Sequence, residues 1–411
     1  MTASANDAIE DRLLQIARQF QPDIAAFCSR LIQTPSVNGI HDEIAIAEVI
    51  AEQARALGLH VQLVGEQARR PNVIVSSRAA GATGLLLLGH LDTVPVGDES
   101  HWTAPPFSGV LRDGKIFGRG AVDTKGGLAA SLYALAALRE AAGDALPGRA
   151  QFIGVPDEET GATGTLGIKY LHATGLLSGL GAIYAYSGRQ ITLGHRGLIR
   201  YRLRCTGEAV HTGAVEWQDG TAGANAVTGM ARLLLALEAI EMPYSTAKYF
   251  ERFRTVLTPG TMINGGVSIN VIPDTCEALM DIRLTPEYDR ERIEELLDSC
   301  IGRVMGEKPR LGFDYELLNY APAAISDENA PVVTVLDGVM QEISGIKPER
   351  VVAGPANEGY LLIERGIPTI CGFGPTGANA HAADEYVNAA SLGETAAIFA
   401  LTAWRLSKYL G

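Results

Sequence analysis

Histidine and acidic residues stand in four groups at the ends of predicted strands, or in the loops that follow them, in this 411-residue sequence. The groups are His90-Leu91-Asp92, Asp123 within GRGAVDTKGG, Asp157-Glu158-Glu159, and His381 after GFGPTGANA. Imidazole and carboxylate are ligands that a borderline cation such as zinc accepts, and a catalytic site keeps one position for water. These residue types predict a catalytic metal site, provided that the fold brings the groups together.

Each residue also has an ordinary structural explanation when it is taken alone. A histidine at a strand end is usually a hydrogen-bonded structural residue, a lone Asp in a loop is usually a cap, and a Glu-Glu pair is usually solvated surface. In open α/β sheets, however, ligands bind just beyond the carboxyl ends of the strands. Their combination at one rim of a sheet is therefore more informative than any single member.

The segments that must position these groups alternate between strand and helix patterns. A helical pattern over 41–57 stops at Gly58, strand patterns follow at 60–64 and 72–78, and GLLLLGHLDTVPV is typical of a strand buried on both faces. A helical pattern over 125–141 and the strand pattern RAQFIGVP come next. This alternation predicts an α/β domain of three layers with a mostly parallel sheet.

The pattern changes near Gly197 and resumes later in the chain. Between these points we predict an alternating strand, a helix over about 222–240, two strands within 266–286, a helix in PEYDRERIEELLDSCIGRV and a last strand in LGFDYELL. This order is that of a ferredoxin-like α+β domain. We therefore predict a discontinuous catalytic domain at 1–197 and 316–411, with an inserted domain at 198–315.

Composition and charge exclude several classes of partner. The net charge of −13 leaves no excess of Lys and Arg to displace phosphate counterions, so we expect no nucleic acid partner. The apolar run at 84–88 is far too short to cross a bilayer, and MTASANDAIEDRLLQIARQF lacks the order of a secretory signal. The five cysteines are an odd number without CxxC spacing, which favours a reducing cytoplasm over disulfides or structural zinc.

Several motifs, in order along the chain, resemble those of the M20 family of metallopeptidases. They are HLDTVP, GRGAVDTKGG, PDEETG and HAADEYV, joined by GEAVHTG, GANAV and NVIPDTCEALMDIR in the inserted domain. That family includes acetylornithine deacetylase, succinyl-diaminopimelate desuccinylase and glutamate carboxypeptidase. The resemblance implies hydrolysis of the amide bond in a small N-acyl amino acid or dipeptide-like substrate. It also implies a homodimer with one or two Zn²⁺ ions per chain, for which Co²⁺ or Mn²⁺ are alternatives.

The resemblance assigns roles to the matching residues of the predicted catalytic domain. The implied metal ligands are His90, Asp123, Glu159 and His381. Asp123 would bridge two metals, and Asp92 would hold the other ring nitrogen of His90. Glu158 would be the general base that takes a proton from the attacking water, while its neighbour Glu159 coordinates.

The inserted domain, by the same resemblance, is a lid that also forms the dimer interface. His211 would reach into the partner's active site and stabilise the oxyanion of the tetrahedral intermediate. Asn270 and Arg283 would bind the substrate, Arg283 by pairing its planar fork with a carboxylate, although an ordinary salt bridge within the sheet is an alternative. The loop at 354–359 would lie along the substrate, which adds Gly354 and Asn357 to the binding residues.

Two stretches depart from the family's pattern. The family usually has a metal-binding Glu-Pro shortly before an Arg-Gly pair, but the stretch before Arg196-Gly197 reads YAYSGR and holds no carboxylate. A second metal would keep only His90 and Asp123 as ligands. The alternatives are a single-metal enzyme, a weak second site and a substitute ligand from elsewhere in the chain. We favour a weak or unfilled second site. The loop GPANEG lacks the usual Thr or Ser and Asp, which puts a specific biosynthetic substrate in doubt.

Two other functions compete with amide hydrolysis at the level of sequence. Ureido or carbamoyl hydrolysis is the nearest alternative, because the same activation of water serves both bonds. A non-catalytic binding protein that kept the fold is the alternative from another class. It is disfavoured because the chain keeps Glu158, Asp92 and His211 together.

Overall fold

The computed structural model describes residues 3–161 and 164–410, and its chain divides into two compact units. The first comprises Met1–His195, Ile325–Ala353 and Asn357–Gly411, and the second Arg196–Ala324 and Gly354–Ala356. The chain thus returns to the first unit later than the 315/316 boundary that the sequence predicts. The reason is that β12 (Gly312–Ala321) stays paired with β9 (Gly197–Thr206) as far as Ala321.

A six-stranded sheet forms the centre of the first unit, in the order β1-β2-β6-β3-β7-β15. Its strands are β1 (His60–Val64), β2 (Asn72–Ser76), β3 (Thr83–His90), β6 (Arg149–Val155), β7 (Gly181–Tyr184) and β15 (Thr369–Ile370). The strands β6, β3, β7 and β15 are parallel neighbours, whereas β2 is antiparallel to both β1 and β6. Every residue of β2, β3 and β7 is buried, which explains their apolar sequences. The predicted α/β class with a mostly parallel sheet is confirmed.

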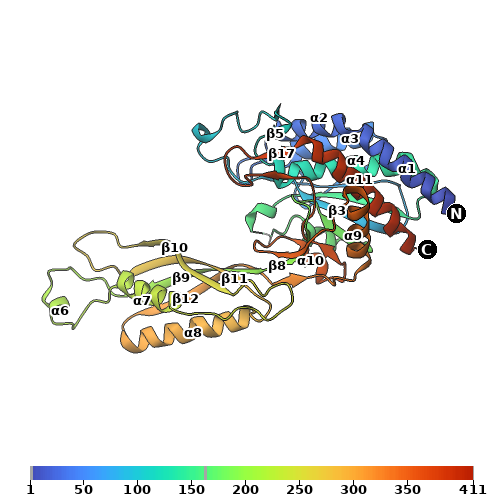
Figure 1. Cartoon of the computed structure of the whole chain (residues 1–411). Coiled ribbons are helices and arrows are strands. Elements are labelled where there is room, and N and C mark those ends of the chain that lie inside the picture. Colours follow the sequence, from blue (N-terminus) through green and yellow to red (C-terminus); the bar gives the residue numbers. More distant parts are fainter. Residues whose placement is uncertain (1–2, 162–163, 411) are drawn as a thin grey trace. The chain divides into compact units, whose positions relative to one another are not determined.

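Helices cover this sheet. They are α1 (Ala3–Gln19), α2 (Gln21–Ile32), α3 (Ile44–Ala56), α4 (Gly126–Ala142), α5 (Ile168–Ala173), α9 (Pro331–Ser344), α10 (Gly359–Ile363) and α11 (Ala389–Ser407). The alanine- and leucine-rich α4 packs against α11, and both contact β3 and β6. Figure 1 shows α1, α2, α4 and α11 gathered on one side of this unit, while α9 and α10 contact β15. No helix within the described ranges is long and apolar enough to cross a membrane.

Two smaller sheets complete the first unit. One has the order β16-β17-β5-β4, from β4 (Val110–Arg112), β5 (Lys115–Phe117), β16 (Gly377–Ala378) and β17 (Tyr386–Asn388). The other contains β8 (Ile191–His195) parallel to β14 (Arg350–Ala353), with β13 (Ala324–Ile325) where the chain passes between the units. The pairing of β17 with β5 carries the loop around His381 to the segment that precedes Asp123.

The second unit has the predicted ferredoxin-like order. It runs β9, α6 (Val215–Gln218), α7 (Ala226–Glu238), β10 (Val256–Gly265), β11 (Thr275–Leu284), α8 (Arg290–Glu307) and β12. Its antiparallel sheet has the order β10-β11-β9-β12. Along β9, Ile199, Tyr201 and Leu203 are buried in the core, whereas the arginines between them lie on the other face and pair with acids of β11 and β12.

The prediction of two strands within 266–286 was half wrong. Residues 275–284 form β11, but 266–274 are loop, and the partner strand β10 lies earlier at Val256–Gly265. Pro259 lies within β10, and the register shifts between Pro259 and Met262. Proline cannot donate a hydrogen bond to a neighbouring strand, so its presence in a sequence argues against a strand. Here β10 lies at the edge of its sheet, and the register shift accommodates Pro259.

Candidate metal centre and active site

The carboxyl ends of three neighbouring parallel strands bring the predicted site residues together. His90 ends β3 and is paired in register with Val155 of β6, and Leu88 is paired with Tyr184 at the end of β7. Glu158 lies just beyond β6, in a short turn at Glu158–Thr160 that also holds Glu159. The rim that the strand pattern predicts is therefore present, with Asp92 directly after β3.

The other two predicted ligands come from loops. Asp123 lies in a buried turn, Ala121–Lys125, that leads into α4. His381 lies between β16 and β17 with its backbone in the left-handed region, at φ 63°. That conformation is uncommon for a residue other than glycine and is found disproportionately at functional sites.

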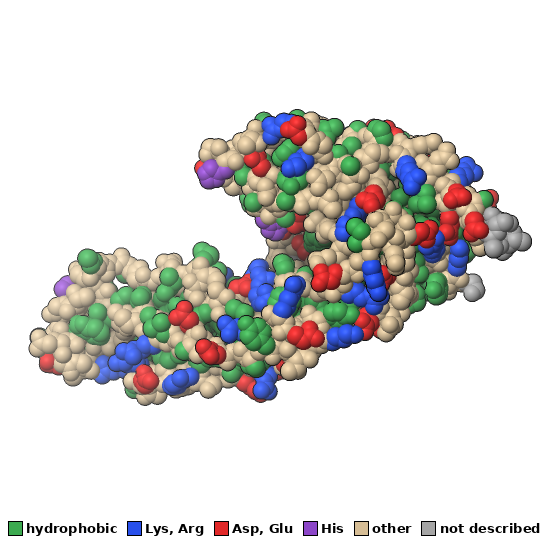
Figure 2. Space-filling view, viewed as in Figure 1, with side chains coloured by type: hydrophobic (Ala, Val, Ile, Leu, Met, Phe, Trp, Pro, Cys, Tyr) green, Lys and Arg blue, Asp and Glu red, His purple; other side chains and the backbone are tan. Residues whose placement is uncertain are grey.

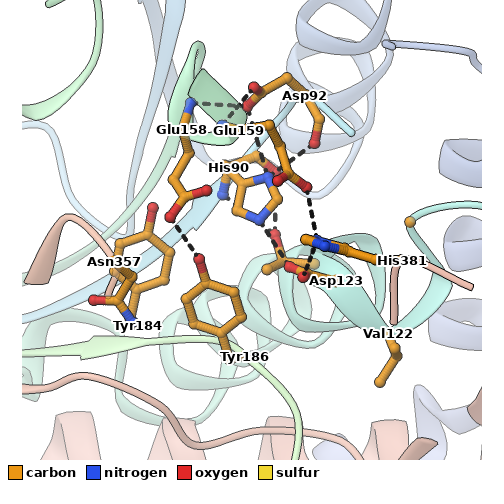
Figure 3. Close-up of polar contacts among 12 residues, drawn as sticks. His90, Asp92, Val122, Asp123, Glu158, Glu159, Tyr184, Tyr186, Asn357 and His381 are labelled. Atoms are coloured by element: carbon orange, nitrogen blue, oxygen red, sulfur yellow. Dashed lines mark hydrogen bonds and ion pairs between the residues drawn. The ribbon is translucent and has the colours of Figure 1, made fainter. Parts of the chain in front are cut away.

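All four predicted ligands converge (Figure 3). His90 Nε2 lies 2.8 Å from Asp123 Oδ1, and His381 Nε2 lies 3.1 Å from Asp123 Oδ2. His381 Nε2 is also 3.3 Å from Glu159 Oε1. His90, Asp123 and Glu159 each offer one ligand atom, and these atoms lie within 4.8 Å of one another.

The electrostatics of this group suit a bound cation. Hydrogen bonds to Asp123 and Glu159 raise the pKa of His381 to about 10. Burial alone would raise the pKa of Asp123, but hydrogen bonds from His381 and His90 outweigh it and hold that pKa below its ordinary value. Protons on the imidazoles thus hold the two carboxylates in place. A divalent cation can take the place of those protons, and two imidazole nitrogens with two carboxylates fit zinc.

Asp92 orients both His90 and the Glu-Glu turn, but not in the predicted way. His90 Nδ1 lies 2.8 Å from the main-chain carbonyl oxygen of Asp92, whereas the nearest carboxylate oxygen is 3.6 Å away. The carboxylate accepts hydrogen bonds from the main-chain N–H groups of Glu158 at 3.2 Å and Glu159 at 3.0 Å. Asn38 Nδ2 donates a further bond at 2.6 Å. The ring is therefore held by a carbonyl, and the carboxylate positions the neighbouring turn.

Glu158 is turned away from the ligand group toward two tyrosines. Its side chain is buried, which raises its pKa to about 8. The Tyr186 hydroxyl donates to Glu158 Oε1 at 3.0 Å (Figure 3). The Tyr186 ring stacks on Tyr184 at 4.8 Å, and the Tyr184 hydroxyl lies 3.5 Å from Glu358 Oε2.

A model of the peptidase family M20/M25/M40 matches residues 86–405. The chain belongs to this family. It is 29% identical over 387 residues to a succinyl-diaminopimelate desuccinylase of Methylorubrum populi, which covers 91% of this chain and 96% of that relative. Membership makes this chain a metal-dependent hydrolase of amide bonds in small substrates.

Solved structures of M20 proteins share the fold. The dipeptidase Dug1p of Saccharomyces cerevisiae superposes with a TM-score of 0.74 at 17% identity, over 97% of this chain and 98% of that one. A dinuclear metal-binding M20 peptidase of Bacillus subtilis superposes with a TM-score of 0.67 at 15% identity, over 94% and 98%. The α/β unit with a ferredoxin-like insertion is therefore the M20 architecture.

Sequence reasoning missed Glu385, which organises the loops that carry Asp123 and His381 in this M20 chain. Its fully buried carboxylate accepts from the main-chain N–H groups of Gly120, Val122 and Asp123 at 3.0–3.1 Å. It also accepts from Arg119 Nη1 at 2.7 Å. The sequence feature that could have indicated Glu385 is its position in the HAADEYV motif, four residues after His381.

The residues predicted from the inserted domain lie in the second unit. His211 is exposed, accepts a hydrogen bond from the Gly213 N–H at 3.0 Å and has Nε2 at 3.4 Å from Asn270 Nδ2. Arg283 directs Nε and Nη2 to the carboxylate of Asp281 at 2.8 and 3.3 Å. The structure thus places His211 beside Asn270. The guanidinium group of Arg283 forms a salt bridge with Asp281 within the sheet.

The loop at 354–359 is held by hydrogen bonds between side chains and main-chain groups. The carbonyl of Gly354 accepts a hydrogen bond from Arg196 at 3.4 Å. Asn357 is buried, donates to the carbonyl of Cys371 at 2.6 Å and accepts from the N–H of Gly359 at 2.9 Å. These contacts give Asn357 a role in shaping the loop, and its contact with substrate remains a prediction.

Proposed function

We propose that this M20 hydrolase is a zinc enzyme that cleaves the amide bond of an N-acyl amino acid or dipeptide-like compound. The observation that carries the proposal is the convergence of His90, Asp123, Glu159 and His381 beside the buried carboxyl group of Glu158. Two imidazoles with two carboxylates suit zinc, and Co²⁺ and Mn²⁺ are the alternatives. A cation bound there supplies a Lewis acid that polarises the scissile carbonyl and lowers the pKa of the attacking water.

Glu158 moves the proton in this proposal. Its carboxylate takes a proton from water while the water oxygen bonds to the carbonyl carbon. It then gives that proton to the amide nitrogen as the C–N bond breaks, which leaves a carboxylic acid and an amine. A pKa raised to about 8 by burial suits a group that must both accept and return a proton near neutral pH.

The second unit supplies the groups that stabilise the transition state and bind the substrate. His211 donates to the oxyanion, Asn270 orients His211 or contacts the substrate directly, and Arg283 attracts a substrate carboxylate. The contact between His211 and Asn270 supports a joint role. The pair between Arg283 and Asp281 means that a substrate carboxylate must compete with Asp281 or use the remaining N–H groups.

We propose further that the chain forms a homodimer through the second unit. The strand β10 lies at the edge of its sheet, and apolar side chains are exposed on it and on the loop that follows, among them Met262, Ile263, Val267 and Ile269. Leu235 of α7 is exposed as well, and Figure 2 shows hydrophobic side chains at the surface of this unit. Exposed edges and apolar patches of this kind are normally covered by a partner.

Cysteine usage supports a cytoplasmic location. All five cysteines are free and buried, and burial raises the pKa of Cys28, Cys205 and Cys371 to about 12. Unpaired thiols in such numbers suit a reducing compartment.

A substrate panel with defined metals tests the proposed function. Metal-free protein reconstituted with Zn²⁺, Co²⁺ or Mn²⁺ is assayed for amine release from N-succinyl and N-acetyl amino acids and from dipeptides. N-carbamoyl amino acids are included to test the alternative bond. We expect turnover of at least one amide class that chelator abolishes and Zn²⁺ restores. Turnover confined to N-carbamoyl compounds, or turnover that survives removal of the metal, would overturn the proposal.

A further inference from the structure

The turn after β6 presents two adjacent carboxyl groups whose main chains are held alike. Both N–H groups, of Glu158 and of Glu159, donate to the carboxylate of Asp92. The two side chains nevertheless diverge. Glu159 lies 3.3 Å from His381, within the ligand group, whereas Glu158 Oε1 accepts a hydrogen bond from Tyr186 at 3.0 Å (Figure 3). Adjacent side chains in this one-turn helix point in different directions, and Tyr186 supplies the hydrogen bond that holds the Glu158 carboxyl group on its side.

Tyr186 is well placed to act as a fixed donor. It follows β7, which continues past its last residue through a hydrogen bond from the Ala185 N–H to the Leu88 carbonyl at 2.7 Å. Its ring stacks on Tyr184 with an interplanar angle of 21° and lies 5.8 Å from the His90 ring. A phenol keeps its proton at neutral pH, so its hydroxyl donates to a carboxylate there.

A carboxylate next to a bound cation has two available roles, as ligand and as base. If Glu158 were free to turn, a second carboxylate beside Glu159 would gain by coordinating, and the base would be lost. The hydroxyl of Tyr186 occupies Oε1 and opposes that rotation. We propose that Tyr186 is a positioning residue, which keeps Glu158 out of the cation's coordination and holds it ready for proton transfer. This inference rests on the role of Glu158 in the proposed function.

Tyr186→Phe tests the inference, with Tyr184→Phe as the matched control. The control removes the Tyr184 hydroxyl, which lies near Glu358, and keeps the stacking of the two aromatic rings. Each variant is compared with wild type for kcat and KM and for Zn²⁺ affinity, the latter by competition with a chelator and without substrate. The same substitutions are then repeated in a Glu158→Gln background.

We expect Tyr186→Phe to lower kcat about tenfold with little change in KM, because the variant loses one hydrogen bond to a charged group. We expect the same variant to bind Zn²⁺ more tightly, on the order of tenfold, because Glu158 is released to coordinate. Both effects should disappear in the Glu158→Gln background, and Tyr184→Phe should leave both quantities within about twofold of wild type.

Zn²⁺ affinity that is the same in wild type and Tyr186→Phe would overturn the inference, whatever happens to kcat. So would a fall in kcat that persists undiminished with Gln at 158, since Tyr186 would then act on something else. If wild-type protein hydrolysed none of the amides in the panel, the proposed function would fail. The Zn²⁺ affinities would still decide the role of Tyr186, because they require no turnover.

Discussion

At the scale of single residues, the proposed roles of general base and metal ligand fall on two adjacent glutamates. Glu159 belongs to the group of His90, Asp123 and His381, and Glu158 lies buried beside it with its own hydrogen-bond partner. Such a division suits hydrolysis, because a carboxylate that coordinates has given up the lone pair that a base needs.

Glu158→Gln should keep the fold and the metal but lower kcat by about 10² to 10⁴, the usual contribution of general acid–base catalysis. Amine release in steady state measures it, with metal content measured on the same sample. Asp157→Asn is the matched control in the same turn, since asparagine tolerates the left-handed backbone at φ 70°. If Glu158→Gln retained more than about a tenth of wild-type kcat, the roles of the two glutamates would have to be exchanged or abandoned.

Cation binding should release protons. Without a cation, hydrogen bonds to the carboxylates of Asp123 and Glu159 raise the pKa of His381 to about 10. Burial alone would lower the pKa of His90, but the hydrogen bond to Asp123 and the nearby negative charge of Asp92 raise it well above its usual range. Both imidazoles must lose their protons to coordinate, so affinity should fall as pH falls below about 10, by up to tenfold per pH unit for each proton displaced. Calorimetry at pH 7 in buffers of different ionisation enthalpy should count one to two protons released per Zn²⁺. A count of zero would mean that His381 and His90 are not ligands.

At the scale of elements, the site is assembled where three loops meet around Glu385. The carboxylate of Glu385 joins the turn that carries Asp123 to the loop that carries His381. Arg119, which pairs with it, also donates to the carbonyls of Pro95 and Ala382 at 3.2 Å. The loops after β3, β5 and β16 are thus tied to one buried ion pair, so the positions of the predicted ligands Asp123 and His381 depend on a residue outside the predicted ligand group.

Glu385→Gln should weaken Zn²⁺ affinity by about 10- to 100-fold, because outer partners of metal ligands typically contribute that much. The replacement keeps the volume but turns an amide N–H₂ toward N–H groups that need an acceptor. Chelator competition measures the affinity, and thermal unfolding of the metal-free protein checks that the fold survives. Glu10→Gln, which disrupts the ion pair with Arg405 elsewhere in the first unit, is the control. Equal affinities in wild type and Glu385→Gln would show that the loops hold their shape without it.

At the scale of the whole molecule, the groups proposed for one reaction lie in two compact units. His211 and Asn270 belong to the second unit and the metal ligands to the first. The proposed role of His211 therefore implies that the second unit, from the same chain or from a partner, supplies groups to the reaction. The exposed apolar residues of β10 and α7 favour a dimer.

Mixing two inactive variants distinguishes these arrangements. If His211 acts across the interface, a mixed dimer of Glu158→Ala and His211→Ala has one site that lacks both residues and one intact site. Activity should then recover toward half of the wild-type value per mixed dimer, whereas each single variant loses roughly a hundredfold or more. If His211 serves its own chain, every site lacks one residue and no activity returns. Sedimentation of differently tagged chains confirms that subunits have exchanged.

The amino-acid sequence by itself determined the class of fold, and its resemblance to the M20 family predicted which residues would form the metal-binding group. This was within reach because each ligand is local in sequence to the end of a strand or to a motif, and parallel strands share one edge wherever they lie. The resemblance named His90, Asp123, Glu159 and His381 as expected ligands, and the structure brings these four side chains together. Only the tertiary structure decided which atom of Asp92 holds His90, that Tyr186 faces Glu158, and that Glu385 joins the loops. These contacts connect side chains whose direction depends on packing between distant segments, about which the order of residues along the chain says nothing.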